Sequence, residues 1–224
     1  MKRFWGYAKN EKFSVGCTGQ TTYVYDYNGV EAAKFKDIKY AYTPMFCPNK
    51  NMFIVKSTDG WLVFYSLDNF QLIKKIHFSK IGAQDEGLCF SPDGTFLFNI
   101  EKPNQSTATE LVIYETGTFQ EIRRLFRNEK TIVLSTIEYD ANDNNYYVLG
   151  FLRGENGIYD KGFVAKLDDK QITDIHTIDN EYFDYLKAYK YIEKQGFTEQ
   201  SIKWSILKDK ELKPVQLSDV IRAK

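Results

Sequence analysis

Carboxylates are the only abundant acid–base groups in this sequence, so hydrolysis of a glycosidic bond is the enzyme chemistry that its residues could support. The 224-residue chain has 30 Asp and Glu residues but only two histidines. A glycosidase needs an acid and a base or nucleophile that face each other across a pocket. Asp85, Glu86 and Asp184 are the candidates, because we place them near the starts of inner strands. Acidic residues at strand entrances are more often solvated, which makes this the alternative interpretation.

The histidines and cysteines do not form the residue pairs or motifs that metal binding or cysteine redox chemistry needs. His77 and His176 lie alone in two segments that we expect to be outer strands, and there is no HExxH sequence. Cys17, Cys47 and Cys89 form no CxxC pair, and we interpret them as small packing residues. The motifs GxxxxGK[ST], GxGxxG and G-x-S-x-G are also absent. The leading interpretation therefore has no catalytic residue, no metal site and no cofactor.

The charge balance and the hydropathy pattern narrow the range of partners. Thirty Lys and Arg residues balance thirty Asp and Glu residues, so net charge does not favour nucleic acid or an anionic membrane. The N-terminal segment has no apolar signal-peptide core, and no apolar run of 18 residues occurs. We therefore expect a soluble cytoplasmic protein that is a monomer by itself and binds neither nucleic acid nor a membrane.

The elements that must position any site are indicated by the segment FSPDGTFLF at 90–98. Its apolar ends favour extended backbone, Pro92 presets φ, and Asp93 and Gly94 suit a tight turn, so the segment predicts a hairpin. The same layout of an aromatic residue, a polar turn and an apolar strand recurs at 46–53, at 139–146 and less regularly at 7–13.

A second hairpin follows each of these turns and aligns better than the first. The five copies are TYVYDYNGVEAAKF, LVFYSLDNFQLIKKI, LVIYETGTFQEIRRL, FVAKLDDKQITDIHTI and IKWSILKDKELKPVQL. Their second residues lie 40, 49, 52 and 39 positions apart, close to the length of a four-stranded propeller blade. The pattern predicts an all-β, single-domain β-propeller over 1–224 with about five blades. The approximate repeats are 1–38, 39–82, 83–130, 131–179 and 180–224.

These hairpins resemble the WD-repeat type of β-propeller. FSPDGTFLF is similar to the hairpin of that family's first two strands, and Val24-Tyr25-Asp26 stands where such repeats often carry Trp-Asp. The family's Gly-His and Trp-Asp dipeptides are absent here. The resemblance implies a ring of blades, and five-bladed propellers also host carbohydrate chemistry, which is the basis of the carbohydrate-binding or glycosidase-like alternative.

The fifth repeat leaves two interpretations open. Apolar and aromatic residues in 180–197 recur with helical spacing, with Asn180 as an N-cap and Gly196 as a C-cap. The competing interpretation puts 183–188 and 189–193 in two strands of a fifth blade. In either case we expect a terminal hairpin at 202–217.

The repeat pattern also assigns the connections to two faces. Short turns such as 91–94 and 116–118 share one face, here named the turn face. Long connections at 79–86, 101–109 and 153–162 share the opposite face, here named the loop face. We expect a noncatalytic protein–protein interaction module, such as an adaptor, scaffold, inhibitor or immunity-type protein, whose partner binds the loop face. The predicted binding residues are Gln84, Asp85, Lys102, Asn104, Gln105, Arg153, Glu155, Asn156 and Tyr159.

Overall fold

The structure, a computed structural model, describes residues 2–80, 87–103, 109–154, 159–168, 171–197 and 213–223, with Tyr159 described by its backbone. These residues form sixteen strands in four antiparallel sheets, each ordered as in the sequence. Blade 1 contains β1 (Gly6–Lys9), β2 (Phe13–Cys17), β3 (Thr22–Asp26) and β4 (Glu31–Phe35). Blade 2 contains β5 (Ala41–Phe46), β6 (Met52–Ser57), β7 (Trp61–Ser66) and β8 (Leu72–His77). Blade 3 contains β9 (Leu88–Phe90), β10 (Phe96–Glu101), β11 (Glu110–Glu115) and β12 (Gln120–Leu125). Blade 4 contains β13 (Ile132–Asp140), β14 (Asn145–Arg153), β15 (Tyr159–Leu167) and β16 (Ile172–Ile178).

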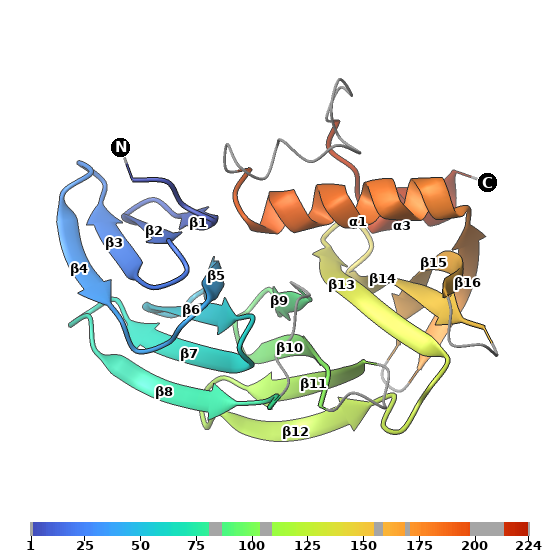
Figure 1. Ribbon diagram of the computed structural model, residues 1–224, viewed down its shortest axis with the longest axis horizontal. Helices are drawn as coiled ribbons and strands as arrows, with labels where there is room; N and C mark the ends of the chain where they lie inside the picture. The colour runs from blue at the N-terminus through green and yellow to red at the C-terminus, as the bar shows by residue number, and fades with distance from the viewer. Residues whose placement is uncertain are drawn as a thin grey trace.

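The four sheets are arranged radially. The first strands β1, β5, β9 and β13 lie toward the centre, and the last strands β4, β8, β12 and β16 form the outer rim (Figure 1). Contacts between β1 and β5 and between β9 and β13 join neighbouring blades at the inner edge. The predicted β-propeller is therefore confirmed, with four blades among the described residues in place of about five.

Turn chemistry explains why the hairpins form where the sequence predicts them. The Asp93 carboxylate accepts hydrogen bonds from the Ser91 hydroxyl (2.6 Å) and from the amide and hydroxyl of Thr95 (3.0 and 2.6 Å). The bond from Ser91, followed by those from Thr95, lowers the pKa of Asp93 to about 2. Gly94 has a φ of 71°, and a Cβ there would lie 2.0 Å from the Pro48 carbonyl oxygen in the turn of blade 2. Only glycine fits this contact between adjacent turns.

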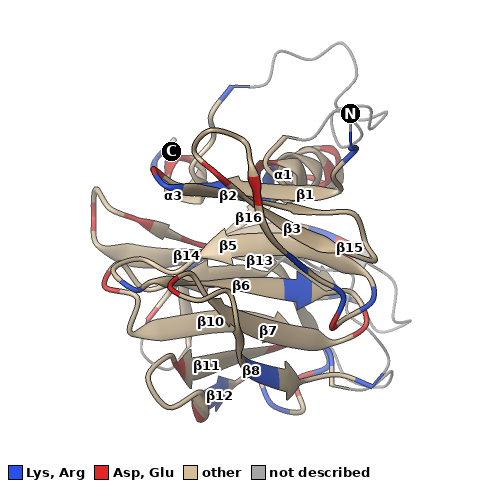
Figure 2. Cartoon of the chain, turned by 90° about the vertical axis from the view of Figure 1, so that its left-hand side faces the viewer, with Lys and Arg blue, Asp and Glu red and all other residues tan. Residues whose placement is uncertain are grey.

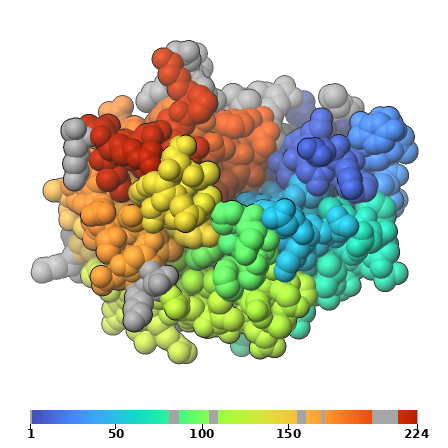
Figure 3. Space-filling view, turned by 180° about the vertical axis from the view of Figure 1, so that it is seen from behind, coloured from blue at the N-terminus to red at the C-terminus, as the bar shows by residue number. Residues whose placement is uncertain are grey.

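The core consists of layers between successive blades. Clusters of apolar side chains join blade 1 to blade 2, blade 2 to blade 3, and blade 3 to blade 4. A fourth cluster joins blade 4 to the C-terminal helices. Charged residues lie mostly at strand ends and on outer strands such as β8, while β6, β7 and β10 are largely uncharged (Figure 2). The space-filling view shows the blades following one another around the ring (Figure 3). Apolar clusters thus cover both faces of blades 2, 3 and 4 and the face of blade 1 that meets blade 2.

The fifth repeat is helical where two interpretations were open. Helix α1 spans Asn180–Lys194, so the strand interpretation of 183–193 is wrong. The N-cap is Asp179, whose carboxylate accepts a hydrogen bond from the Tyr182 amide (2.8 Å), and not Asn180 as predicted. Gly196, with a φ of 71°, ends the helix as the sequence indicates.

The end of the chain is also helical. Residues 202–212 of the predicted terminal hairpin lie outside the described residues. Residues 213–216 form no strand, and Leu217 begins helix α3 (Leu217–Arg222), so the predicted last strand near 213–217 is wrong. Helix α3 packs on blade 4, where Ser218 donates a hydrogen bond to the Asp140 carboxylate and the Arg222 guanidinium pairs with Asp140 and Asp143 (3.1 Å each). Burial of Leu217 and Val220 against this blade favours the helix over a free strand.

Helix α1 closes the ring between blades 4 and 1 (Figure 1). Its cap residue Gln195 accepts a hydrogen bond through its carbonyl from the Tyr7 amide in β1 (2.9 Å). The Lys190 ammonium pairs with Glu138 of β13 (2.6 Å) and with Glu193 (3.0 Å). The Lys194 ammonium donates to the carbonyl of Ile137 (2.6 Å) and to that of Leu88. The helix therefore takes the position in which we expected a fifth blade.

This closure can be tested at Gly196. A Cβ at Gly196 would lie 2.3 Å from the Tyr7 carbonyl oxygen, whereas a Cβ at Gly29, which has a similar φ of 78°, would meet nothing within 4 Å. We expect Gly29→Ala to cost about 1–2 kcal/mol for its left-handed backbone. Gly196→Ala should cost about 1–3 kcal/mol more, because the helix end must move away from β1. Denaturant unfolding of the two variants measures the difference, and equal losses would show that the contact does not stabilise the ring.

Candidate functional site

The structure places three of the nine predicted binding residues on the loop face. Lys102 directly follows β10, Arg153 ends β14, and Tyr159 begins β15. Arg153 and Tyr159 pair across β14 and β15, whereas Lys102 belongs to the neighbouring blade. The other six, Gln84, Asp85, Asn104, Gln105, Glu155 and Asn156, lie outside the described residues.

Both ends of the 102–109 connection are fastened to neighbouring blades. The Ser79 hydroxyl, just after blade 2, donates a hydrogen bond to the Lys102 carbonyl (2.8 Å). The Thr109 hydroxyl accepts one from the Leu134 amide in blade 4 (2.6 Å). The buried Lys56 ammonium of blade 2 donates to the Ile100 carbonyl (2.8 Å). The base of this part of the loop face is therefore held by three blades.

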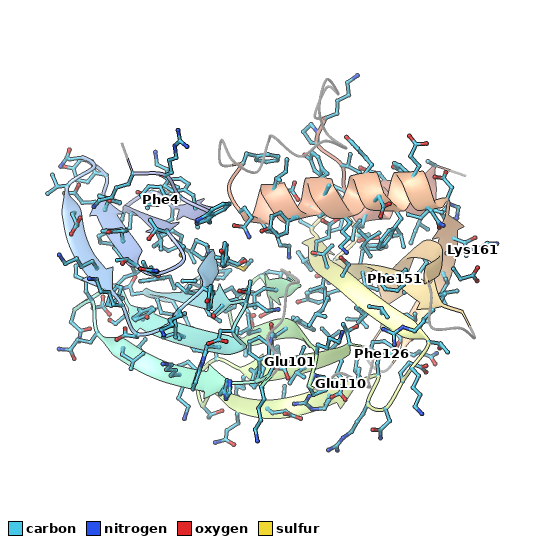
Figure 4. The ribbon with its side chains drawn as sticks, in the orientation of Figure 1. Phe4, Glu101, Glu110, Phe126, Phe151 and Lys161 are labelled. Atoms are coloured by element: carbon cyan, nitrogen blue, oxygen red, sulfur yellow. The ribbon has the colours of Figure 1, made fainter. Side chains whose placement is uncertain are left out.

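A buried charged cluster lies directly below this connection. Glu101 and Glu110 pair across β10 and β11, and Figure 4 shows them close together. The Arg124 guanidinium of β12 reaches Glu110 (2.7 Å), Glu101 (3.3 Å) and Glu121 (2.6 Å). We name Glu101, Glu110 and Arg124 the carboxylate–arginine cluster. Although Arg124 lies on an outer strand, its guanidinium neutralises these buried carboxylates.

The electrostatics of this cluster suit a structural role. Burial raises the pKa of Glu101 above its usual value, although the hydrogen bond from Tyr114 (2.6 Å) and the charge of Arg124 oppose that rise. An acid with a raised pKa beside a second carboxylate is the arrangement used in acid–base catalysis. Here the Glu101 oxygens already accept hydrogen bonds from Tyr114, Asn99 (3.0 Å) and Arg124, and Glu101 is 1% exposed. A substrate therefore has no access to this carboxylate.

The other residues considered for chemistry are dispersed. Asp184 lies on α1 with an exposed side chain, so its predicted position near an inner strand is wrong. Asp85 and Glu86 lie outside the described residues. His77 ends β8 and stacks on Trp61 with ring centroids 4.1 Å apart, and His176 lies in β16, so both are on outer strands as predicted. Across the described ranges, no three His, Cys, Asp or Glu side chains gather as metal ligands do.

The cysteines are packing residues, as their sequence positions indicate. Cys17 and Cys47 are buried, and Cys89 is half-buried. Burial raises the pKa of Cys17 to about 12 and that of Cys47 to about 11. The thiolate is the reactive form of cysteine, so neither thiol is activated near neutral pH.

The turn face contains a cavity that the sequence interpretation missed. It lies between blades 3 and 4 and has a volume of about 850 Å³. Its lining residues come from β10, β11 and β12 of blade 3, and from the first turn, β14, β15 and the last turn of blade 4. They are Phe96, Phe98, Ile113, Ile122, Arg123, Leu125, Asn144, Asn145, Tyr146, Leu167, Asp168 and Gln171. The sequence predicts binding on the loop face, but here the short turns of the turn face border a space of ligand size.

Comparison with known proteins supports the fold. No protein-family model matches the sequence, and no curated protein matches it. Among solved structures, the chain is similar to Kuenenia stuttgartiensis hydrazine synthase, with a TM-score of 0.61, 14% identity, and coverage of 75% of this chain and 51% of that chain. It is also similar to the dihydro-heme d1 dehydrogenase NirN in complex with DHE, with a TM-score of 0.52, 15% identity, and coverage of 80% and 46%.

The chain thus spans about half the length of each of these two structures. Both neighbours have β-propeller folds, and at such low identity the likeness shows the fold alone. It does not extend the WD-repeat resemblance to membership of that family. Neither α1 nor α3, the helices of the described part, has the length and apolar character to cross a membrane.

The carboxylate–arginine cluster gives a test of what holds the loop face in place. Arg124→Met would leave Glu101 and Glu110 buried without their guanidinium partner, and we expect a loss of about 3–5 kcal/mol in the free energy of unfolding. The matched variant Arg127→Met removes an exposed guanidinium and should cost less than about 0.5 kcal/mol. Urea unfolding at pH 8 measures both values.

The loss in Arg124→Met should shrink as the pH falls toward 5. Burial already raises the pKa of Glu101, and removal of the guanidinium raises it further. A carboxyl whose folded-state pKa is raised favours folding below its unfolded pKa and loses that contribution as pH rises through its folded pKa. A loss in Arg124→Met that is independent of pH would show that the loss does not come from uncompensated charge on Glu101.

Proposed function

We propose that this protein is a noncatalytic protein-interaction module whose partner, another protein, binds the loop face. The observation that carries the proposal is the fastening of the 102–109 connection at both ends, to Ser79 after blade 2 and to Leu134 in blade 4. A loop with fixed ends loses less conformational freedom on binding than a loop with free ends. The buried cluster beneath it adds rigidity that a solvated insertion would not need.

The residue types around this base suit protein recognition. Arg153 and Tyr159 stand at adjacent positions of β14 and β15, and Arg and Tyr are the types that most often anchor interfaces. Lys102 adds a second cation at the base of the neighbouring connection. The proposed partner surface also includes the other six predicted binding residues, which are Gln84, Asp85, Asn104, Gln105, Glu155 and Asn156.

The class of binding protein also belongs to the proposal. An adaptor or scaffold, an inhibitor and an immunity-type protein each need a rigid ring that presents a specific surface, and none needs a reactive group of its own. We expect the protein to act in the cytoplasm as a monomer that pairs with one other protein, without nucleic acid or membrane.

Site-specific cross-linking in the cells of origin tests the location of the surface. A photoreactive benzoylphenylalanine would replace Lys102 or Arg153 on the loop face, and Lys12 or Asp68 on the turn face. We expect a cross-link to the same partner protein from both loop-face positions and from neither turn-face position. Equal cross-linking from the two faces would overturn the assignment.

Affinity for the purified partner provides the quantitative test. The double variant Lys102→Glu/Arg153→Glu should weaken binding at least about 30-fold, which corresponds to about 2 kcal/mol. The matched variant Lys9→Glu/Lys12→Glu makes the same charge change at the turn-face end of blade 1 and should leave affinity within about twofold. An unchanged affinity in the first variant would contradict a loop-face site.

A further inference from the structure

On the turn face, a phenylalanine fills two of the three gaps between consecutive blades. Phe70, in the turn between β7 and β8, packs edge-on against Phe13 of blade 1, with ring centroids 5.6 Å apart and an interplanar angle of 88°. Phe119, in the turn between β11 and β12, packs against Phe64 of blade 2 at 4.8 Å and 60°. In both cases the last turn of a blade carries a ring back onto the preceding blade.

The backbone at these two positions shows that the arrangement is a built feature of the fold. Phe70 and Phe119 have φ values of 54° and 58°, in the left-handed region that bulky side chains rarely adopt. Such strain persists only where the surrounding contacts compensate for it. Burial of the phenyl ring between two blades is that compensation.

The strand register identifies the corresponding residue in blade 4. In blade 3, the pair Glu115 and Gln120 encloses a four-residue turn whose last residue is Phe119. In blade 4, the pair Leu167 and Ile172 encloses four residues, and the last of them is Gln171. Gln171 is exposed. The third gap therefore lacks the phenyl ring that fills the other two.

The cavity lies where that ring would be. Phe96 and Ile113 line it, together with Gln171 itself. Phe96 is the first residue of β10, as Phe13 is of β2, and Ile113 is the fourth residue of β11, as Phe64 is of β7. The side chains that receive a phenyl ring in the first two gaps thus have counterparts in the third that receive none.

The walls and the rim of the cavity differ in character. Phe98 and Tyr146 form an aromatic wall with ring centroids 4.3 Å apart. The side-chain amides of Asn144 and Gln171 stand at the rim, and the Asn144 carbonyl already accepts a hydrogen bond from the Tyr139 hydroxyl (2.6 Å). The space therefore offers an aromatic wall, amide groups, and the charged side chains of Arg123 and Asp168.

We propose that this cavity binds a small molecule that has an aromatic ring and a polar substituent. The ring would take the position that Phe70 and Phe119 take in the other gaps, and the substituent would meet the amide groups of the rim. The volume of about 850 Å³ exceeds one phenyl group and falls in the range of small-molecule sites. Aromatic walls favour an aromatic occupant through edge-to-face contacts, and apolar cavities of smaller size bind benzene. This site lies on the opposite face from the proposed partner surface and is independent of it.

Titration with phenol, observed by NMR, tests the proposal on the whole wild-type protein. We expect saturable binding, with nuclear Overhauser contacts from the phenol ring protons to the methyl groups of Ile113 and Ile122. Cyclohexanol, which has the same hydroxyl but no aromatic ring, should bind about tenfold more weakly. Equal binding of the two compounds, or contacts located elsewhere, would overturn the proposal.

Two matched variants test the role of the ring, one by filling the gap between blades 3 and 4 and the other by emptying the gap between blades 2 and 3. Gln171→Phe supplies the missing ring, so it should raise the melting temperature and weaken phenol binding at least about tenfold. Phe119→Gln empties the gap between blades 2 and 3, so it should lower the melting temperature and add a second phenol site. If Gln171→Phe fails to fold, Gln171→Leu fills part of the space and should also weaken phenol binding. Unweakened phenol binding in a folded Gln171 variant would refute the site.

A peptide-like probe separates a free ligand from the side chain of a partner. N-acetylphenylalaninamide has the same ring on a peptide backbone. We expect phenol to bind at least as well as this probe, because the proposed occupant is one ring with one polar substituent and no peptide backbone. Binding of N-acetylphenylalaninamide without binding of phenol would overturn the small-molecule assignment and indicate a partner's phenylalanine as the occupant.

Discussion

Every blade of this protein has two faces that must be covered, and a row of four blades leaves one face of blade 1 and one face of blade 4 without a neighbouring blade. Helices α1 and α3 cover blade 4 through Phe183, Leu186 and Leu217. Phe4, which Figure 4 labels beside blade 1, lies against Gly16, where a Cβ would come within 2.6 Å of its ring. Its ring centroid lies 6.3 Å from that of Tyr23. The ring depends on these two solutions, because an apolar sheet face left in water would cost stability and favour aggregation.

Closing the ring with a helix changes the chemistry of its centre. A fifth blade would present another strand edge to β1, whereas α1 presents long side chains near its C-terminal end. The Lys190 ammonium pairs with Glu138, and the Lys194 ammonium donates to carbonyls of β9 and β13. Burial removes the Lys194 ammonium from water and thereby lowers its pKa. The two carbonyl contacts offset part of the cost of this desolvation. Carbonyls that a strand ladder would satisfy are satisfied here by a lysine.

The sequence predicts the local elements well and the long-range partners poorly. The hairpin around Ser91 and Gly94 is predictable because its hydrogen bonds lie within six residues. Segment 180–197 remained open because tyrosines suit both helix and strand, and only packing against blade 4 decides between them. The role of Arg124 is not predictable from the sequence, because its partners, Glu101 and Glu110, come from two other strands, and nothing local shows that those glutamates face the interior.

The cavity shows why regularity itself can carry functional information. The last turns of blades 3 and 4 have equal length between paired strand residues, so glutamine stands in blade 4 at the register position where blade 3 has phenylalanine. Read singly, Gln171 is an ordinary exposed turn residue. Its meaning depends on Phe70 and Phe119, whose positive φ angles and ring contacts establish what the position does elsewhere in the ring. Because Phe70 and Phe119 fill the gaps between blades 1 and 2 and between blades 2 and 3, the cavity beside Gln171 can be recognised as the gap in which the same ring is missing.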